Sequence, residues 1–224
     1  MTKLNKIFKE KTEKQLIIEF IRLFKTLIEK KEKNQRFSFA LPGGTSPINL
    51  YKYLSKAKIN WKKIDLFLVD ERFVAYKSNN LNFNTVKKYL INKINISKKN
   101  IFFINTNKEN VFETTKDYEE KLKNYFKNRK IQFDLILLGM GLDGHIASIF
   151  SDNLDIKDKD LVCTVLKEDF ERISLKLETI NKAKKIILWL NNKRKSRAYR
   201  KIKSKKNVPV NKLNKKKVDL FLVN

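Results

Sequence analysis

Three short segments carry the side chains that could do chemistry in this chain of 224 residues. They are Leu-Pro-Gly-Gly-Thr-Ser-Pro at 41–47, Val-Asp-Glu-Arg-Phe-Val at 69–74 and Gly-Met-Gly-Leu-Asp-Gly-His at 139–145. All five glycines of the chain lie in the first and third segments. Because glycine permits sharp turns and a close approach of the backbone to a ligand, these segments are candidates for a binding site.

The first segment has the composition of a phosphate-binding turn. Gly43 and Gly44 would let the backbone approach an anion, and the hydroxyls of Thr45 and Ser46 would donate hydrogen bonds at the start of a helix. The alternative is an ordinary Gly-Gly turn, in which Thr45 or Ser46 caps a helix opened by Pro47. The spacing matches neither a Walker A loop nor a dinucleotide fingerprint, which argues against nucleoside triphosphates and dinucleotides as ligands.

The other two segments supply groups for proton transfer and charge. His145 is the chain's single histidine, and imidazole is the side chain best suited to move protons near neutral pH. Asp143 could orient that imidazole or a water, or could simply cap the turn. Asp70, Glu71 and Arg72 follow an apolar run, and they are either a solvated loop or part of the same site.

Apolar runs predict the elements that would position these segments. Mostly apolar runs rich in Ile, Leu, Val and Phe at 37–41, 64–69, 101–104 and 133–138 are typical of buried parallel strands, and further strands are expected near 161–166, 172–177, 185–190 and 218–223. Helices are expected at about 10–32, from Pro47, and near 82–91, 112–128, 178–183 and 193–203. This alternation predicts one α/β domain over 1–224, a three-layer α/β/α Rossmann-like arrangement with a mainly parallel sheet and room for a small subsidiary lobe late in the chain.

Composition restricts the partners. The formal charge of +27 suggests a polyanion, but 43 of the 51 basic residues are lysine and only 8 are arginine, whereas specific DNA readers rely on arginine. With one histidine and one cysteine, Cys163, we expect no disulfide framework and no metal site built from nitrogen and sulfur. The N-terminus is charged and no apolar run approaches a membrane span, so we expect a cytoplasmic protein that makes no membrane contact.

The three segments, in this order, resemble the 6-phosphogluconolactonases of the glucosamine-6-phosphate isomerase/6-phosphogluconolactonase family. The resemblance extends through Asn82-Phe83, through the strand beginning at Arg172 and to Lys195 at the start of a late helix. It departs from the family pattern at Leu81, Ile146, Ser151 and Asn192. A glucosamine-6-phosphate deaminase, or a related sugar-phosphate isomerase, is the alternative, but the deaminase Phe-Asn-Glu-Pro after the histidine turn is absent.

The resemblance implies a carboxylic ester hydrolase that converts 6-phospho-D-glucono-1,5-lactone to 6-phosphogluconate in the oxidative pentose phosphate pathway. His145 would be the general base, oriented by Asp143. Arg72 would stabilise developing negative charge or bind the phosphate, and Asp70 or Glu71 would hold Arg72. We expect Gly43, Gly44, Thr45 and Ser46 to bind the phosphate with Lys195, and Arg172 is a further candidate.

No metal or organic cofactor is implied, and we expect a monomer. A basic nucleic-acid-binding protein is the alternative from a different class, carried by Lys203, Lys205, Lys206 and the run 215–217. No aromatic side chains interleave with these lysines as a stacking surface would require, so nucleic acid is not the expected partner.

Overall fold

The computed structural model describes residues 4–32, 34–154, 160–205 and 207–224. Within these ranges, one central sheet contains seven strands, and all of its neighbouring strands are parallel. In order across the sheet they are β1 (Lys6–Glu10), β10 (Val218–Val223), β9 (Lys185–Leu190), β6 (Leu135–Leu138), β2 (Phe37–Leu41), β3 (Ile64–Leu68) and β5 (Ile101–Phe102). The predicted α/β class with a mainly parallel sheet is confirmed.

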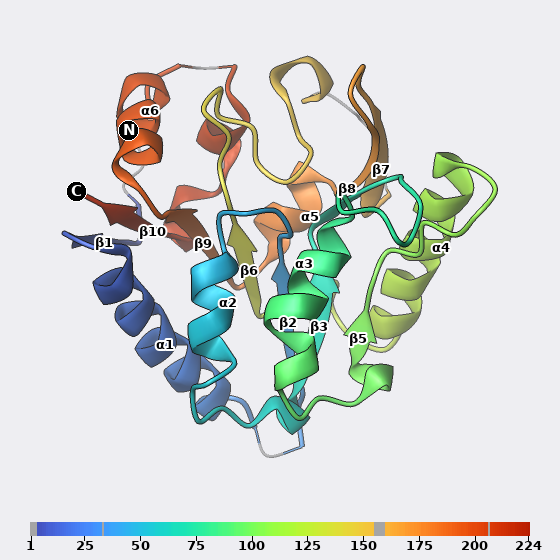
Figure 1. The fold of residues 1–224 in the computed structure, drawn as a ribbon, viewed down its shortest axis with the longest axis horizontal. Coiled ribbons are helices and arrows are strands. Elements are labelled where there is room, and N and C mark those ends of the chain that lie inside the picture. Colours follow the sequence, from blue (N-terminus) through green and yellow to red (C-terminus); the bar gives the residue numbers. More distant parts are fainter. Residues whose placement is uncertain (1–3, 33, 155–159, 206) are drawn as a thin grey trace.

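Helices pack against this sheet. They are α1 (Glu13–Glu29), α2 (Ile48–Leu54), α3 (Asn82–Tyr89), α4 (Val111–Phe126), α5 (Leu177–Lys182) and α6 (Lys193–Ile202). In Figure 1, α1, α2 and α3 lie in front of the sheet and α5 lies behind it. The buried stripe of α1 shows how the layers join, because the Phe20 ring lies 5.9 Å from Trp189 of β9 and 6.0 Å from Phe221 of β10. Burial on both faces explains why the central strands are mostly apolar.

A second, smaller sheet in the described part of the chain is antiparallel. Its order is β4 (Asp70–Arg72), β8 (Glu171–Leu175) and β7 (Val162–Leu166). The late strands of this sheet form the subsidiary lobe that the sequence allowed, but β4 comes from the segment interpreted as a strand end or loop. Here the chain leaves β3 and continues as a short strand of the other sheet. The register places Arg72 directly opposite Arg172.

Strand β1 was not predicted, and the expected helix at 10–32 begins later, at Glu13. Three of the five residues of β1 are charged, so its sequence lacks the apolar run by which the other strands were recognised. It lies at the edge of the sheet and pairs with β10, where exposed charged side chains are tolerated. No helix in the described part of the chain is long and apolar enough to cross a membrane.

Candidate active site

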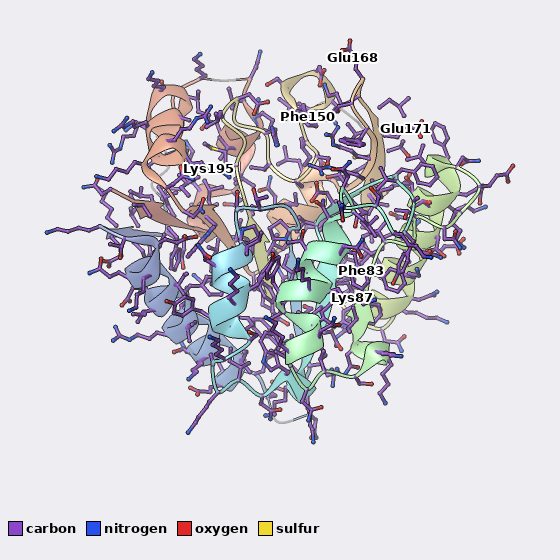
Figure 2. All side chains as sticks on the ribbon, in the orientation of Figure 1. Phe83, Lys87, Phe150, Glu168, Glu171 and Lys195 are labelled. Atoms are coloured by element: carbon purple, nitrogen blue, oxygen red, sulfur yellow. The ribbon has the colours of Figure 1, made fainter. Side chains whose placement is uncertain are left out.

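Four strands of the central sheet, β2, β3, β6 and β9, deliver the segments that follow them to one edge, where a pocket of about 820 Å³ lies. This is the carboxyl edge of the parallel strands, where ligands bind in open α/β sheets. Ten of the residues singled out from the sequence line the pocket: Gly43, Gly44, Thr45, Ser46, Asp70, Arg72, Asp143, His145, Arg172 and Lys195. Figure 2 shows Lys195 on α6 and Phe150 on the loop that faces it.

The glycine turn after β2 packs tightly on the start of α3. A Cβ atom at Gly43 would lie 2.2 Å from the Cβ of Asn82, so the turn reaches its position because residue 43 has no side chain. The helix cap expected at Thr45 or Ser46 is wrong, since Pro47 is the N-cap of α2 and makes no side-chain cap bond. The carbonyl of Thr45 accepts from the Ile48 N–H instead, which leaves both hydroxyls facing the pocket.

Lys195 reaches this turn from α6. The Asn192 side chain caps the helix and accepts from the backbone N–H of Lys195 at 3.0 Å. The Lys195 ammonium donates to the Ser46 hydroxyl at 2.6 Å. Burial lowers the pKa of Lys195. Within the described ranges the ammonium forms no ion pair, so this corner of the pocket holds an unneutralised positive charge next to a hydroxyl and a glycine turn.

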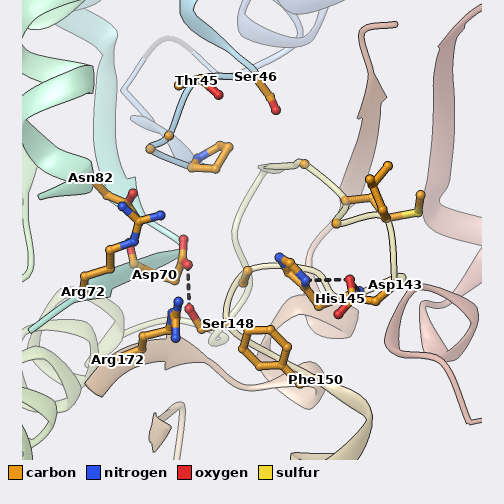
Figure 3. Close-up of a pocket in the computed structure, with 18 of the residues that line it drawn as sticks. Thr45, Ser46, Asp70, Arg72, Asn82, Asp143, His145, Ser148, Phe150 and Arg172 are labelled. Atoms are coloured by element: carbon orange, nitrogen blue, oxygen red, sulfur yellow. Dashed lines mark hydrogen bonds and ion pairs between the residues drawn. The ribbon is translucent and has the colours of Figure 1, made fainter. Parts of the chain in front are cut away.

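The turn after β6 holds His145 against Asp143. The Nδ1 atom of His145 lies 2.8 Å from Oδ1 of Asp143, and the imidazole is partly exposed in the pocket (Figure 3). The backbone closes this turn, because the N–H of Gly141 donates to the carbonyl of His145 at 2.9 Å. A Cβ at Gly141 would lie 2.2 Å from the imidazole, so glycine is needed for the ring to lie where it does.

Electrostatics distinguishes Asp70 from Asp143 among the carboxyl groups that line the pocket. Partial burial alone would raise the pKa of Asp143, but the charge and hydrogen bonds of His145 outweigh it and lower that pKa. Asp70 behaves in the opposite way: burial raises its pKa, and a hydrogen bond from Ser148 only partly offsets the rise. Asp143 is therefore a stable carboxylate, whereas Asp70 binds a proton more readily than an ordinary aspartate.

The two arginines of the pocket differ in how firmly the protein holds them. The guanidinium of Arg172 donates to both carboxylate oxygens of Asp169, at 2.8 and 2.7 Å. Arg72 donates to the Asn80 carbonyl at 3.2 Å, and its guanidinium lies 5.1 Å from the centre of the Phe170 ring. Arg72 is thus the freer of the two to meet a ligand.

We expected Asp70 or Glu71 to hold Arg72, but among the described residues neither carboxylate forms an ion pair with its guanidinium. Successive side chains of a strand point to opposite faces, so Glu71 of β4 points into the protein while its two neighbours face the pocket. Its carboxyl accepts from the backbone N–H groups of Arg72, Asn82 and Phe83 at 2.8, 2.6 and 2.8 Å. Burial raises the pKa of Glu71 to about 8 against these three bonds. Glu71 therefore joins β4 to the start of α3.

Sequence reasoning missed two side chains that support the pocket. The Ser148 hydroxyl donates to Oδ2 of Asp70 at 2.7 Å, and the Phe150 ring lies 4.6 Å from the imidazole of His145. Ser148 lies within, and Phe150 directly after, a tight turn that is closed by two backbone bonds between Ile146 and Ile149, with Ala147 at φ 47°. The sequence feature that could have identified Ser148 and Phe150 is their position within five residues of His145. In the described part of the chain, no group of three His, Cys, Asp or Glu side chains could hold a metal ion.

Comparison with known proteins gives the family. The model of the family Glucosamine-6-phosphate isomerases/6-phosphogluconolactonase matches residues 11–222. A 6-phosphogluconolactonase of Thermotoga maritima is 30% identical over 80% of this chain and 79% of that protein. Another, from Nostoc sp. strain PCC 7120, is 32% identical over 77% of this chain and 74% of that protein.

Solved structures agree in fold. The crystal structure of a 6-phosphogluconolactonase from Thermotoga maritima superposes with a TM-score of 0.85 at 24% identity, covering 99% of each chain. A monomeric glucosamine-6-phosphate deaminase superposes with a TM-score of 0.80 at 19% identity, covering 97% of this chain and 96% of that one. The fold is thus shared by a lactonase and a deaminase, whereas the two sequence relatives named above are both 6-phosphogluconolactonases. The chain belongs to the glucosamine-6-phosphate isomerase/6-phosphogluconolactonase family, on its 6-phosphogluconolactonase side, whose members are hydrolases.

Proposed function

We propose that this chain hydrolyses 6-phospho-D-glucono-1,5-lactone to 6-phosphogluconate, and that His145 activates the attacking water. The observation that carries the proposal is the 2.8 Å contact of His145 Nδ1 with Asp143, in a pocket that also contains the positive corner at Lys195. One pocket thus combines a base with an anion anchor, and a phosphorylated ester needs both.

The protonation of Asp143 decides which imidazole nitrogen acts. Since His145 lowers the pKa of Asp143, this aspartate is a carboxylate near neutral pH and can only accept hydrogen bonds. The proton of the neutral imidazole must then lie on Nδ1, where it is donated to Asp143. Nε2 keeps its lone pair and is the atom that takes a proton from water.

Hydrolysis then follows in two proton transfers. Water oxygen attacks the lactone carbonyl carbon while Nε2 of His145 takes a water proton, and a tetrahedral oxyanion forms. When the bond between that carbon and the ring oxygen breaks, the imidazolium returns the proton to the departing oxygen. The products are an open-chain hydroxyl and a carboxylic acid, which ionises. No covalent enzyme intermediate is needed.

Two basic groups share the negative charges of the substrate. Lys195, Ser46 and the glycine turn would bind the phosphate, because burial without an acidic partner leaves the ammonium in need of an anion. Arg72 would stabilise the oxyanion, since its weak attachment to Asn80 leaves donors free. We assign Arg172 a structural role rather than a substrate-binding one, because its guanidinium already donates to both carboxylate oxygens of Asp169.

The test measures lactone hydrolysis above the uncatalysed rate for His145→Gln and Asp143→Asn. We expect kcat to fall about 100-fold or more in His145→Gln, as general bases contribute 10² to 10⁴. In Asp143→Asn the amide no longer fixes the tautomer, so kcat should also fall while the Michaelis constant stays near wild type. Near-wild-type hydrolysis in a folded His145→Gln variant would remove the base assignment.

The same preparation should be assayed for ammonia release from glucosamine 6-phosphate. Lactone hydrolysis without ammonia release is expected. Ammonia release without lactone hydrolysis would replace the lactonase proposal with the deaminase alternative.

A further inference from the structure

The face of α6 next to Lys195 forms a second hollow, of about 410 Å³, beside the turn that carries His145. Four of its lining residues are cations, three are apolar and none is acidic: Arg194, Arg197, Lys201, Lys205, Leu142, Ala198 and Ile202. Those within α6, from Arg194 to Ile202, recur at the three- and four-residue spacing of one helix face, and Lys205 lies just beyond the end of the helix. Figure 1 shows α6 at the upper left, next to the loop that follows β6.

The arginines of this hollow contrast with the composition of the chain. Lysine outnumbers arginine 43 to 8, yet three of the eight arginines lie in α6, at positions 194, 197 and 200. A general preference for lysine accounts for a lysine-rich surface, but it does not account for two arginines that line one hollow.

These two arginines also lack protein partners. Six arginines of the chain donate to an acceptor within the protein: Arg22 to Glu19, Arg36 to Asp65, Arg72 to Asn80, Arg129 to Tyr125, Arg172 to Asp169 and Arg200 to Asn224. Arg194 and Arg197 are the two without an acceptor or an ion pair among the described residues. Their guanidinium donors are therefore available to a ligand in the hollow.

We propose that this hollow binds a small molecule of the nucleoside diphosphate class, in which two linked phosphates adjoin an apolar ring system. Guanidinium groups match phosphate oxygens in a bidentate manner, which ammonium groups cannot do. Leu142, Ala198 and Ile202 supply an apolar wall for the ring system. The volume of about 410 Å³ falls in the range of small-molecule sites. This proposal does not depend on the activity proposed for the larger pocket.

The lining of the hollow favours this ligand over a nucleic acid strand. Proteins that bind single strands combine a basic groove with aromatic side chains on which the bases stack. No aromatic residue lines this hollow.

The hollow also touches the catalytic turn. Leu142 lines both pockets and lies one residue before Asp143. Beyond α6, the N–H of Val210 donates to the carbonyl of Gly144 at 3.1 Å, so the chain after the helix is fastened to the same turn. A ligand in the hollow would therefore contact the segment that positions His145.

The experiment is calorimetric titration of the full chain with ADP, pyrophosphate and a short RNA at about 150 mM salt, where long-range attraction is screened. We expect ADP to bind more tightly than pyrophosphate or RNA. The double variant Arg194→Gln/Arg197→Gln should weaken ADP binding roughly tenfold or more, since each removes charge-assisted hydrogen bonds. The matched control is Lys193→Gln/Lys203→Gln, which removes the same charge at the two ends of α6, outside the hollow, and should change the affinity by less than about twofold.

Lys195→Ala tests whether ADP enters the substrate pocket instead. Its ADP affinity should equal that of the wild type, and loss of binding there would overturn the proposal. Absence of ADP binding, equal losses in the arginine variant and the lysine control, or pyrophosphate binding as tight as ADP would each overturn it as well. RNA binding tighter than ADP and steeply dependent on salt would assign the cations to nucleic acid.

Discussion

Replacing Gly43 by alanine tests how the glycine turn after β2 is built. The new Cβ would lie 2.2 Å from the Cβ and 2.5 Å from the Cα of Asn82, whereas ordinary contact begins at 3.4 Å. Relief therefore requires a displacement of roughly 1 Å, and because one of the atoms is backbone, a side-chain rotation is not enough. Either the turn or the start of α3 must move.

The magnitude follows from what that movement breaks. Asn82 and Phe83 donate their N–H groups to the buried Glu71 carboxyl at 2.6 and 2.8 Å, and a shift of α3 weakens both bonds. Overpacking costs about 1 to 3 kcal/mol, so we expect Gly43→Ala to lose about 3 kcal/mol of unfolding free energy. For a chain of this size that lowers the Tm by roughly 6 to 12 °C. A misplacement of about 1 Å in a binding site lowers kcat/KM by about 100-fold.

Calorimetry gives the Tm, and the lactone assay gives kcat/KM. Gly139→Ala is the matched control, since it adds a methyl group in the same pocket where a Cβ meets nothing within 4 Å. Its Tm should stay within about 2 °C of the wild type. If Gly43→Ala has the same Tm and the same kcat/KM as the wild type, the contact between the turn and α3 is not as tight as described, and the reasoning fails.

Burial lowers the pKa of Lys195 below its ordinary value of 10.5, so the ammonium loses its proton at a lower pH than a free lysine does. The dissociation constant of 6-phosphogluconate should therefore rise on the alkaline side. In the Lys195→Arg variant, where the guanidinium stays charged, the dissociation constant should not rise over the same pH range. Ala147→Gly should raise the unfolding free energy by up to about 1 kcal/mol in urea, because glycine adopts φ 47° without strain. Ser148→Ala leaves Asp70 without its donor and should cost about 1 to 3 kcal/mol in the same assay. The pKa of Glu71 is about 8 in the folded protein and ordinarily 4.5, so between these pH values the folded state holds more protons than the unfolded state. The free energy of unfolding should therefore fall as the pH rises from 4.5 to about 8. If Glu71→Gln shows the same dependence of unfolding free energy on pH as the wild type, the raised pKa of Glu71 is contradicted.

Neighbouring residues alone were sufficient to predict an element where its burial determines which residue types it contains. The run at 64–69 predicted β3 because a strand covered on both faces is mostly apolar, and its one charged residue, Asp65, is buried in an ion pair with Arg36. The glycine turns were also readable, since a chain with five glycines in two segments marks where its backbone needs freedom. Both features are properties of neighbouring residues.

The remainder depends on contacts between distant residues. Lys6–Glu10 reads as a charged segment, and it is a strand because β10 offers a free edge. Asp70–Arg72 pairs with β8, about a hundred residues later in the chain, and no feature of the residues around Asp70–Arg72 predicts this pairing. Ser148 supports Asp70 only because the tight turn at Ala147 directs it there. The pocket could therefore be located from the sequence, whereas the supporting hydrogen bonds could not.

The pairing of β1 with β10 has a consequence for how the chain is made. The Asn5 side chain bonds Asp219, 214 residues away, and the Asn224 N–H donates to the Glu10 carbonyl. During synthesis β1 emerges early and must remain unpaired until β10 follows. Contacts this distant in sequence are slow to form, because loop closure is costly in entropy. The charges of β1 then protect the nascent chain, since a lysine-bearing edge is a poor template for aggregation while it awaits its partner.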